Sequence, residues 1–283
     1  MTDTVVRTEP SAVDPVTRRA TILASLAAML LGSAITVLVH EIGHWVVGAA
    51  LGYPSQLYAF AVSHGGEQTA GDVAVMAMAG PLVSLVVGLV MTTWTPLRRT
   101  GGTAHLLWLW IGFTSLQEFV TYLVITPFGA GDTAMAVAAL GWGAPVMFAA
   151  LALGIGGMFW QAWRFALHLH RHSGGDHGRA NQLAWHPWLL GVVWMIAVQA
   201  VLLLIAPPTA TGEGGLSPGL VIVLLMASMA ITVFAPMGFI FLRKREVASE
   251  PLRLPAFPTG LVIGYAVLLV INVVLTLTGP TLG

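Results

Sequence analysis

Residues 21–51 read TILASLAAMLLGSAITVLVHEIGHWVVGAAL. From Thr21 to Val39 this stretch carries no ionisable side chain, and the first ones that follow are His40, Glu41 and His44. Crossing the roughly 30 Å hydrocarbon core of a bilayer takes about 20 apolar residues in a helix. The stretch therefore predicts a membrane-spanning helix that carries ionisable side chains near its end.

The composition of the whole chain agrees with a membrane protein. Of 283 residues, 57% are hydrophobic and 8% are charged, and the mean hydropathy is +0.84. A soluble domain has about a quarter of its residues charged. Nucleic-acid binding is disfavoured because 12 basic residues are offset by 12 acidic ones. Cysteine is absent, so any metal must be held by His, Asp or Glu.

Seven stretches are long enough and sufficiently free of charge to span a bilayer. Since lipid offers no partner for unpaired backbone groups, all are expected to be helices. The predicted spans are 21–51, 73–95, 104–126, 143–163, 186–206, 219–242 and 259–276. A short apolar stretch from Thr133 either lies at the membrane interface or extends the fourth helix. The expected fold class is an all-α polytopic membrane protein.

The Lys and Arg residues predict how the chain is oriented. Basic residues close to span ends favour the cytoplasmic side, and with seven spans all 12 of them fall on one side of the membrane. The N-terminus is then cytoplasmic and the C-terminus outside, in a multi-pass protein of the cell membrane. Residues 1–20 form a disordered cytoplasmic tail, 21–140 a core of three spans, and 141–283 an additional four-span region.

The sequence His40-Glu41-Ile42-Gly43-His44 is the strongest chemical signal. Side chains four residues apart on a helix share one face, which suits two histidine ligands of a tetrahedral zinc. Glu41 would then lie beside the metal and could exchange a proton with a bound water. The alternative is that two hydrogen-bonded histidines and a neutral Glu join helices, but ionisable residues within a span are costly and are functional by default.

A catalytic zinc site takes three protein ligands and leaves a position for water. Four residues on the same side of the membrane are candidates for the third: His64, Glu67, Asp72 and Asp132. Asp132 is favoured because neighbouring Pro and Gly residues break the third span where a carboxylate must turn towards the metal. It is equally suited to cap the N-terminus of a following helix, and the pattern alone leaves both roles open.

These motifs resemble the site-2 protease family of intramembrane zinc metalloproteases. In that family a three-helix core carries His-Glu-x-x-His on its first helix, Gly-Pro on its second and an Asp ligand at the end of its third. The likeness covers residues 21–140. The matching residues here are His40, Glu41, His44, Gly80, Pro81 and Asp132.

The resemblance implies an endopeptidase that hydrolyses peptide bonds in or near the transmembrane segments of other membrane proteins. It implies one zinc per chain on His40, His44 and Asp132, with Glu41 as the catalytic acid–base. It also implies substrate contacts at Gly80, Pro81 and Ser84. The four later spans are then a gate, or a docking surface for a regulatory membrane partner or a second copy.

The chain departs from the family pattern at three positions. Ser84 and Val124 stand where the family often has Asn, and Thr133 stands where Gly follows the Asp. These departures leave open the alternative of a proteolytically inactive, zinc-binding membrane scaffold or partner-binding protein of the same fold. The charge pattern also places the ends of the first and third spans outside, whereas the family commonly opens its site towards the cytosol.

Two further features attract attention. Glu118 lies within the third span, 14 residues before Asp132, which is about 21 Å along a helix. It is therefore expected to be too far away for the same zinc and to pack the third helix, rather than to relay protons or gate substrate.

Five histidines between residues 168 and 186 are expected to lie in a cytoplasmic interfacial loop rather than to bind metal.

Overall fold

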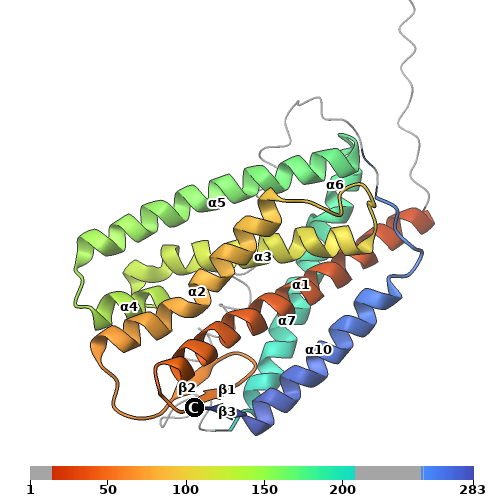
Figure 1. The fold of residues 1–283 in the computed structure, drawn as a ribbon. Coiled ribbons are helices and arrows are strands. Elements are labelled where there is room, and N and C mark those ends of the chain that lie inside the picture. The colour runs from red at the N-terminus through yellow and green to blue at the C-terminus, as the bar shows by residue number, and fades with distance from the viewer. Residues whose placement is uncertain (1–14, 208–249, 251) are drawn as a thin grey trace, which may run out of the picture.

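The computed structural model describes residues 15–207, 250 and 252–283. This part of the chain is mostly helical (Figure 1). Its elements are α1 (Pro15–Ala50), β1 (Ser55–Leu57), β2 (Val62–His64), α2 (Ala70–Thr93), α3 (Thr103–Ile125), the 3-10 turn η1 (Thr126–Phe128), α4 (Asp132–Ala139), α5 (Ala144–Ser173), α6 (His177–Leu183), α7 (Trp185–Ile205), α10 (Thr259–Thr278) and β3 (Thr281–Leu282).

Six stretches of helix within the described residues are long and apolar enough to cross a membrane. They coincide with six of the seven predicted spans, so the expectation of a helical polytopic protein is confirmed at that level. The remaining predicted span, 219–242, lies outside the described residues, as do residues 1–14 of the predicted tail. The prediction of a disordered tail is wrong for residues 15–20, which form the start of α1.

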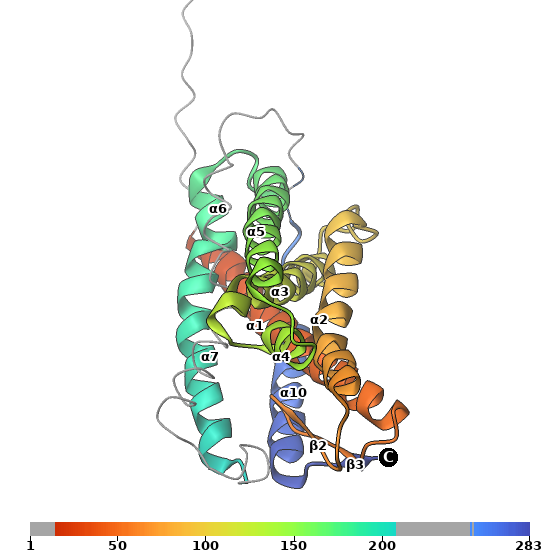
Figure 2. The same cartoon turned by 90° about the vertical axis from the view of Figure 1, so that its left-hand side faces the viewer.

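Helix α1 is central to the molecule. It contacts α2, α3, α6, α7, α10 and the three strands, and the other helices surround it in two perpendicular views (Figures 1 and 2). Small residues let neighbouring helices approach it closely: Ala24 and Ala28 are fully buried, and a Cβ at Gly32 would lie 3.2 Å from the backbone nitrogen of Ile111. Small residues let helix backbones approach closely in a membrane, where no hydrophobic effect drives helices together.

Helix α3 is held between α2 and α5. A Cβ at Gly88 of α2 would lie 2.5 Å from the backbone nitrogen of Leu116, so no side chain fits there. On the other side, the rings of Phe113 and Phe165 pack with centroids 4.5 Å apart. Two close contacts of this kind fix the position of α3, which carries Glu118 and leads to Asp132.

The chain reverses direction after α3. It passes through η1 and a turn in which Gly129 and Gly131 both have positive φ angles, 71° and 80°, and then forms α4. The apolar stretch from Thr133 is thus a separate short helix that ends at Ala139, and Gly141, with φ 65°, follows it before α5 begins. The reversal brings α4 into contact with α2.

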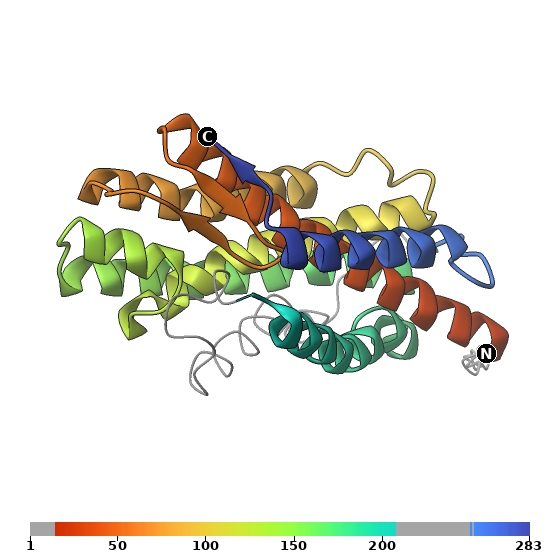
Figure 3. The ribbon, with the colours of Figure 1, turned by 90° about the horizontal axis from the view of Figure 1, so that it is seen from below.

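A small antiparallel sheet departs from the all-α expectation. Its strand order is β2-β1-β3, with Ser55 opposite His64 on one side and Leu282 on the other. The sheet packs beside the end of α1 (Figure 3). Strands of two or three residues are too short for the alternating pattern by which a strand is recognised in sequence.

The predicted histidine-rich loop is also corrected. Helix α5 continues to Ser173 instead of ending near residue 163, so three of the five histidines lie in α5 and the other two lie in α6 and α7. His168 and His172, one turn apart, are buried against other helices, and His172 Nε2 lies 3.2 Å from His105 Nε2. The spacing of four residues places both rings on the packed face of α5.

Candidate metal centre

Three side chains from two separate elements converge near the end of α1. His40 Nε2 lies 3.0 Å from His44 Nε2 and 3.0 Å from Asp132 Oδ2. His44 Nε2 lies 3.2 Å from the same carboxylate oxygen. The side chains of His40 and His44 are 1% and 10% exposed, and that of Asp132 is 20% exposed. The group is therefore compact and largely buried, and it could hold a metal ion.

Hydrogen bonds on the far side of each imidazole fix how the rings are turned. The Nδ1–H of His44 donates to the backbone carbonyl of Met76 at 2.7 Å. Behind His40, the Ser84 hydroxyl donates to Glu118 Oε2 at 2.7 Å and lies 3.2 Å from His40 Nδ1. Since the hydroxyl hydrogen is used on Glu118, Ser84 accepts from His40 Nδ1–H. Metal-binding histidines in proteins are commonly oriented in this way.

The ring orientation has an electrostatic consequence. With both Nδ1 atoms donating, a neutral His40 and a neutral His44 direct their Nε2 lone pairs at each other and at the Asp132 carboxylate. Three electron-rich atoms about 3 Å apart repel one another unless a cation lies among them. Ligand atoms 2.0–2.1 Å from a tetrahedral zinc are about 3.3 Å apart, close to the distances observed. The residues present thus fit a bound metal ion.

Gly80 lets helix α2 pack directly against the two imidazoles. A Cβ at this position would lie 2.3 Å from His44 Nε2 and 2.7 Å from His40 Nε2. Pro81 follows it inside α2 and is buried. Gly80 and Ser84, which the sequence associated with substrate, thus contact the histidines: Gly80 leaves room for the rings and Ser84 orients one of them.

Tyr122 is a member of the site that the sequence analysis missed. Its ring stacks on the His40 imidazole with centroids 5.3 Å apart and planes 10° from parallel. A Cβ at Gly131 would lie 2.5 Å from the Tyr122 ring. The available signal was the spacing of four residues between Glu118 and Tyr122, which places both on one face of α3.

Asp132 begins α4, and its carboxylate is directed to the histidines. The N-cap residue of α4 is Gly131, which makes no capping hydrogen bond through a side chain. Of the two roles that the pattern left open, the structure therefore places Asp132 at the histidines rather than at the cap. Thr133 anchors the turn, because its hydroxyl donates to the carbonyl of Tyr122 at 2.9 Å and lies 2.5 Å from the Thr126 hydroxyl.

The other candidates for the third ligand have different surroundings. His64 Nδ1 lies 2.8 Å from the Ser55 hydroxyl, across the hairpin. Asp72 accepts hydrogen bonds from the hydroxyls of Tyr53 and Thr69, each at 2.7 Å. Glu67 is exposed. Within the described residues, none of the three belongs to a cluster able to hold a metal.

The expected separation of Glu118 from the site is wrong. Glu118 Oε2 lies 3.5 Å from His40 Nδ1, on the side of that ring opposite Asp132. The estimate of about 21 Å assumed one continuous helix, whereas the chain reverses at Gly129 and Gly131. Glu118 is not placed as a ligand itself, but it orients His40 through Ser84.

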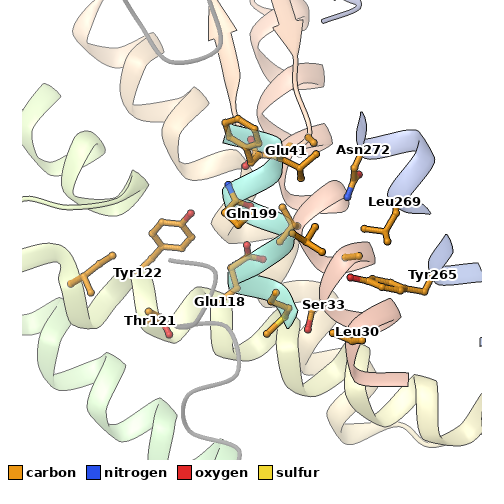
Figure 4. A pocket seen from close by; sticks show the side chains of 18 residues that line it. Leu30, Ser33, Glu41, Glu118, Thr121, Tyr122, Gln199, Tyr265, Leu269 and Asn272 are labelled. Atoms are coloured by element: carbon orange, nitrogen blue, oxygen red, sulfur yellow. The ribbon is translucent and has the colours of Figure 1, made fainter. Parts of the chain in front are cut away.

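A cavity of about 210 Å³ lies next to the residues that surround the three converging side chains, which do not line it themselves. Glu41 lines it together with Glu118 and Tyr122 of α3 (Figure 4). Glu41 is 8% exposed and follows His40 directly. The cavity gives the site room for water and for part of another molecule, with a carboxylate in its wall that is not one of the three converging ligands.

Comparisons of the chain with known protein families, with curated proteins and with solved structures each found no match.

Proposed function

We propose that this protein is an intramembrane zinc endopeptidase that cleaves apolar segments of other membrane proteins. One observation carries the proposal: the outward hydrogen bonds of His40 and His44 direct both Nε2 atoms towards Asp132, next to a cavity that Glu41 lines. A purely structural cluster would have no need of the free carboxylate or of the space beside it.

The ligand set favours zinc over other metals. Two imidazoles and one carboxylate form a common catalytic zinc set that leaves a fourth position open. Magnesium and calcium prefer all-oxygen surroundings, which two imidazoles do not provide. Zinc also has no redox chemistry, which suits a hydrolase.

The zinc and the residues around it would each have a separate role in peptide hydrolysis. A bound zinc would supply Lewis-acid chemistry, polarising the scissile carbonyl and making a water molecule more acidic. Glu41 takes a proton from the attacking water and delivers it to the leaving amine as the peptide bond breaks. Ser84 and Glu118 keep His40 in its orientation throughout, and the stacked ring of Tyr122 covers one of its faces.

The burial of the site restricts its substrates. A helix pairs all its backbone groups internally, so a transmembrane helix must unwind locally before its carbonyl reaches Glu41. Substrates are therefore apolar segments that can lose a turn of helix.

The test is an analysis of new chain termini. Purified wild type and Glu41→Gln are incubated with zinc and a detergent extract of membrane proteins, and the N-termini that form are labelled and sequenced by mass spectrometry. Wild type should generate termini within apolar segments, and Glu41→Gln none. A chelator should abolish the cleavage and added zinc restore it. Metal-loaded wild type that generates no termini would contradict proteolysis and favour the inactive zinc-binding scaffold.

A further inference from the structure

The cavity beside Glu41 is built by both halves of the chain. Its walls come from α1 and α3 of the predicted three-span core, from the tip of the hairpin, and from α7 and α10. Figure 4 shows Tyr265 and Asn272 of α10 and Gln199 of α7 around the same space as Glu41 and Glu118. The later helices therefore form part of the site's wall.

Two polar side chains in this wall lack hydrogen-bond partners. Ser33 Oγ on α1 and Asn272 Oδ1 on α10 are buried, and no described residue pairs with either atom. The two residues are 3% and 8% exposed, and both line the cavity. Buried polar atoms are nearly always paired. The two atoms therefore point to a ligand that enters the cavity.

The rest of the wall tells what kind of ligand fits. Most of its other residues are apolar, among them Leu30, Val37, Ile125, Leu202 and Leu269. A lipid chain would pack against these apolar residues but would leave Ser33 and Asn272 without hydrogen-bond partners. Water alone would pair the two polar groups but would leave the apolar surface hydrated, which is unfavourable. An intact helix has no free backbone groups to offer. An unwound apolar peptide satisfies both kinds of surface.

We infer that Ser33 and Asn272 bind the backbone of an unwound apolar peptide segment and hold it opposite Glu41. The inference rests on the proposed function for its substrate class. The Asn272 carboxamide oxygen accepts from a backbone N–H, and the Ser33 hydroxyl donates to a backbone carbonyl. Both contacts are independent of side-chain identity, so the site selects segments by how easily their helix opens.

Helix α10, which carries Asn272, is hydrogen-bonded to helix α7. Trp194 Nε1–H on α7 donates to the Tyr265 hydroxyl on α10 at 2.9 Å, and Asn272 lies two turns further along α10. Helices α7 and α10 also contact α1 directly. The two polar groups thus face the cavity from helices that are packed together.

The test measures peptide binding without cleavage. The probe is a fluorescein-labelled leucine-rich peptide with a central Gly-Pro, and a peptide of the same length without the Gly-Pro serves as its comparison. Binding to detergent-solubilised Glu41→Gln protein is followed by fluorescence anisotropy, with and without chelator. The variants Asn272→Leu and Ser33→Ala are added to this background. Thr276→Val is the matched control, because the buried Thr276 hydroxyl, one turn further along α10, also has no partner among the described residues and does not line the cavity.

The Gly-Pro peptide should bind more tightly than its comparison. Asn272→Leu and Ser33→Ala should each weaken its binding about three- to tenfold, as for the loss of one hydrogen bond, while Thr276→Val leaves it unchanged. Equal binding by Asn272→Leu and the parent, or an equal loss in Thr276→Val, would overturn the inference. Selective peptide binding by protein that purifies without metal would support the peptide site and contradict the zinc hydrolase. Metal-loaded protein that binds both peptides with equal affinity would contradict the peptide site and leave the zinc hydrolase supported.

Discussion

Gly80 is the residue at which one added methyl group would disturb the metal centre most directly. Alanine there would place its Cβ within 2.3 Å of His44 Nε2 and 2.7 Å of His40 Nε2. Since α2 is packed against α1 on this side, the rings must move away from Asp132. Gly80→Ala should therefore bind metal at least about tenfold more weakly, as measured by competition with a chromophoric chelator.

A glycine in open space provides the control for this substitution. Gly156 lies in α5 and has no neighbour within 4 Å of an added Cβ. Gly156→Ala should keep its metal and gain about 0.5–1 kcal/mol of helix stability. Loss of metal in both variants, or in neither, would show that the contact of Gly80 with the imidazoles does not govern the site.

Ser84 and Glu118 act on the metal through His40. Ser84→Ala removes the hydroxyl that joins His40 Nδ1 to Glu118, and Glu118→Gln removes the carboxyl group behind it. Each should weaken metal binding about ten- to a hundredfold, as is typical of residues that orient a ligand. Because Glu118 acts through Ser84, the two effects should not add. The double variant should bind metal only slightly more weakly than the single variant that has the lower metal affinity. Full additivity in the same chelator competition would mean that they act separately.

The candidate ligands on α1 were more predictable than their surroundings. His40 and His44 lie four residues apart on one helix, so their relative geometry follows from helical spacing alone. Asp132 was favoured among the four candidates for the third ligand, but its role stayed open, because capping a helix and facing a metal draw on the same residue type. Glu118 and Tyr122 reach His40 only through tertiary packing, and local spacing gave a wrong separation for Glu118.

At the scale of elements, the turn between α3 and α4 determines whether Asp132 reaches the histidines. Gly129 and Gly131 both have positive φ angles, a conformation that costs other residues about 1–2 kcal/mol. Only Gly131 also contacts the Tyr122 ring, whereas an added Cβ at Gly129 meets nothing within 4 Å. The two positions also differ in backbone conformation: Gly129 is left-handed with ψ 22°, whereas Gly131 has ψ 176°, a region that is essentially restricted to glycine.

Alanine substitutions at Gly129 and Gly131 should separate the effect of backbone strain on stability from the effect of packing on metal binding. Gly129→Ala should lower the free energy of unfolding by about 1–2 kcal/mol, and Gly131→Ala should lower it by more, because its backbone region is essentially restricted to glycine and its Cβ meets the Tyr122 ring; both are measured by denaturant titration. Gly131→Ala alone should also weaken metal binding, because it displaces Tyr122 and the start of α4. Equal metal affinity in the two variants would contradict the assignment of this turn as the device that positions Asp132.

The helices could be predicted from sequence because spans of about 20 apolar residues have one structural solution in lipid. Their ends were less certain, as the extension of α5 to Ser173 illustrates. The sheet could not be predicted, since its third strand comes from residues 281 and 282, more than two hundred positions from the hairpin. Pairing at that distance leaves no local pattern.

At the scale of the whole molecule, the segment before α10 is tied to the connection between α2 and α3. Glu250 accepts hydrogen bonds from Arg98, one of them from Nε at 2.7 Å. The Arg98 guanidinium holds the pKa of Glu250 below its ordinary value. With side chains 40% and 35% exposed, the pair contributes no more than about 1 kcal/mol.

This ion pair predicts a pH-dependent difference in stability. Because the folded-state pKa is lowered, the contribution is complete above the ordinary pKa of a glutamate, about 4.3, and is lost as the pH falls through the lowered value. Glu250→Gln should unfold at a lower temperature than wild type at neutral pH, and the gap should close in acid. Glu67→Gln, which removes an exposed carboxylate elsewhere, should show no such trend in the same fluorescence melts.

The metal content of the purified protein tests the central claim most directly. Wild type, Glu41→Gln, His44→Ala and Asp132→Ala are purified in detergent without chelator and measured by elemental mass spectrometry. Wild type and Glu41→Gln should each hold about one zinc per chain, and the two ligand variants should hold none. Metal-free wild type, or zinc retained in both ligand variants, would contradict the assignment of His40, His44 and Asp132 as a zinc site.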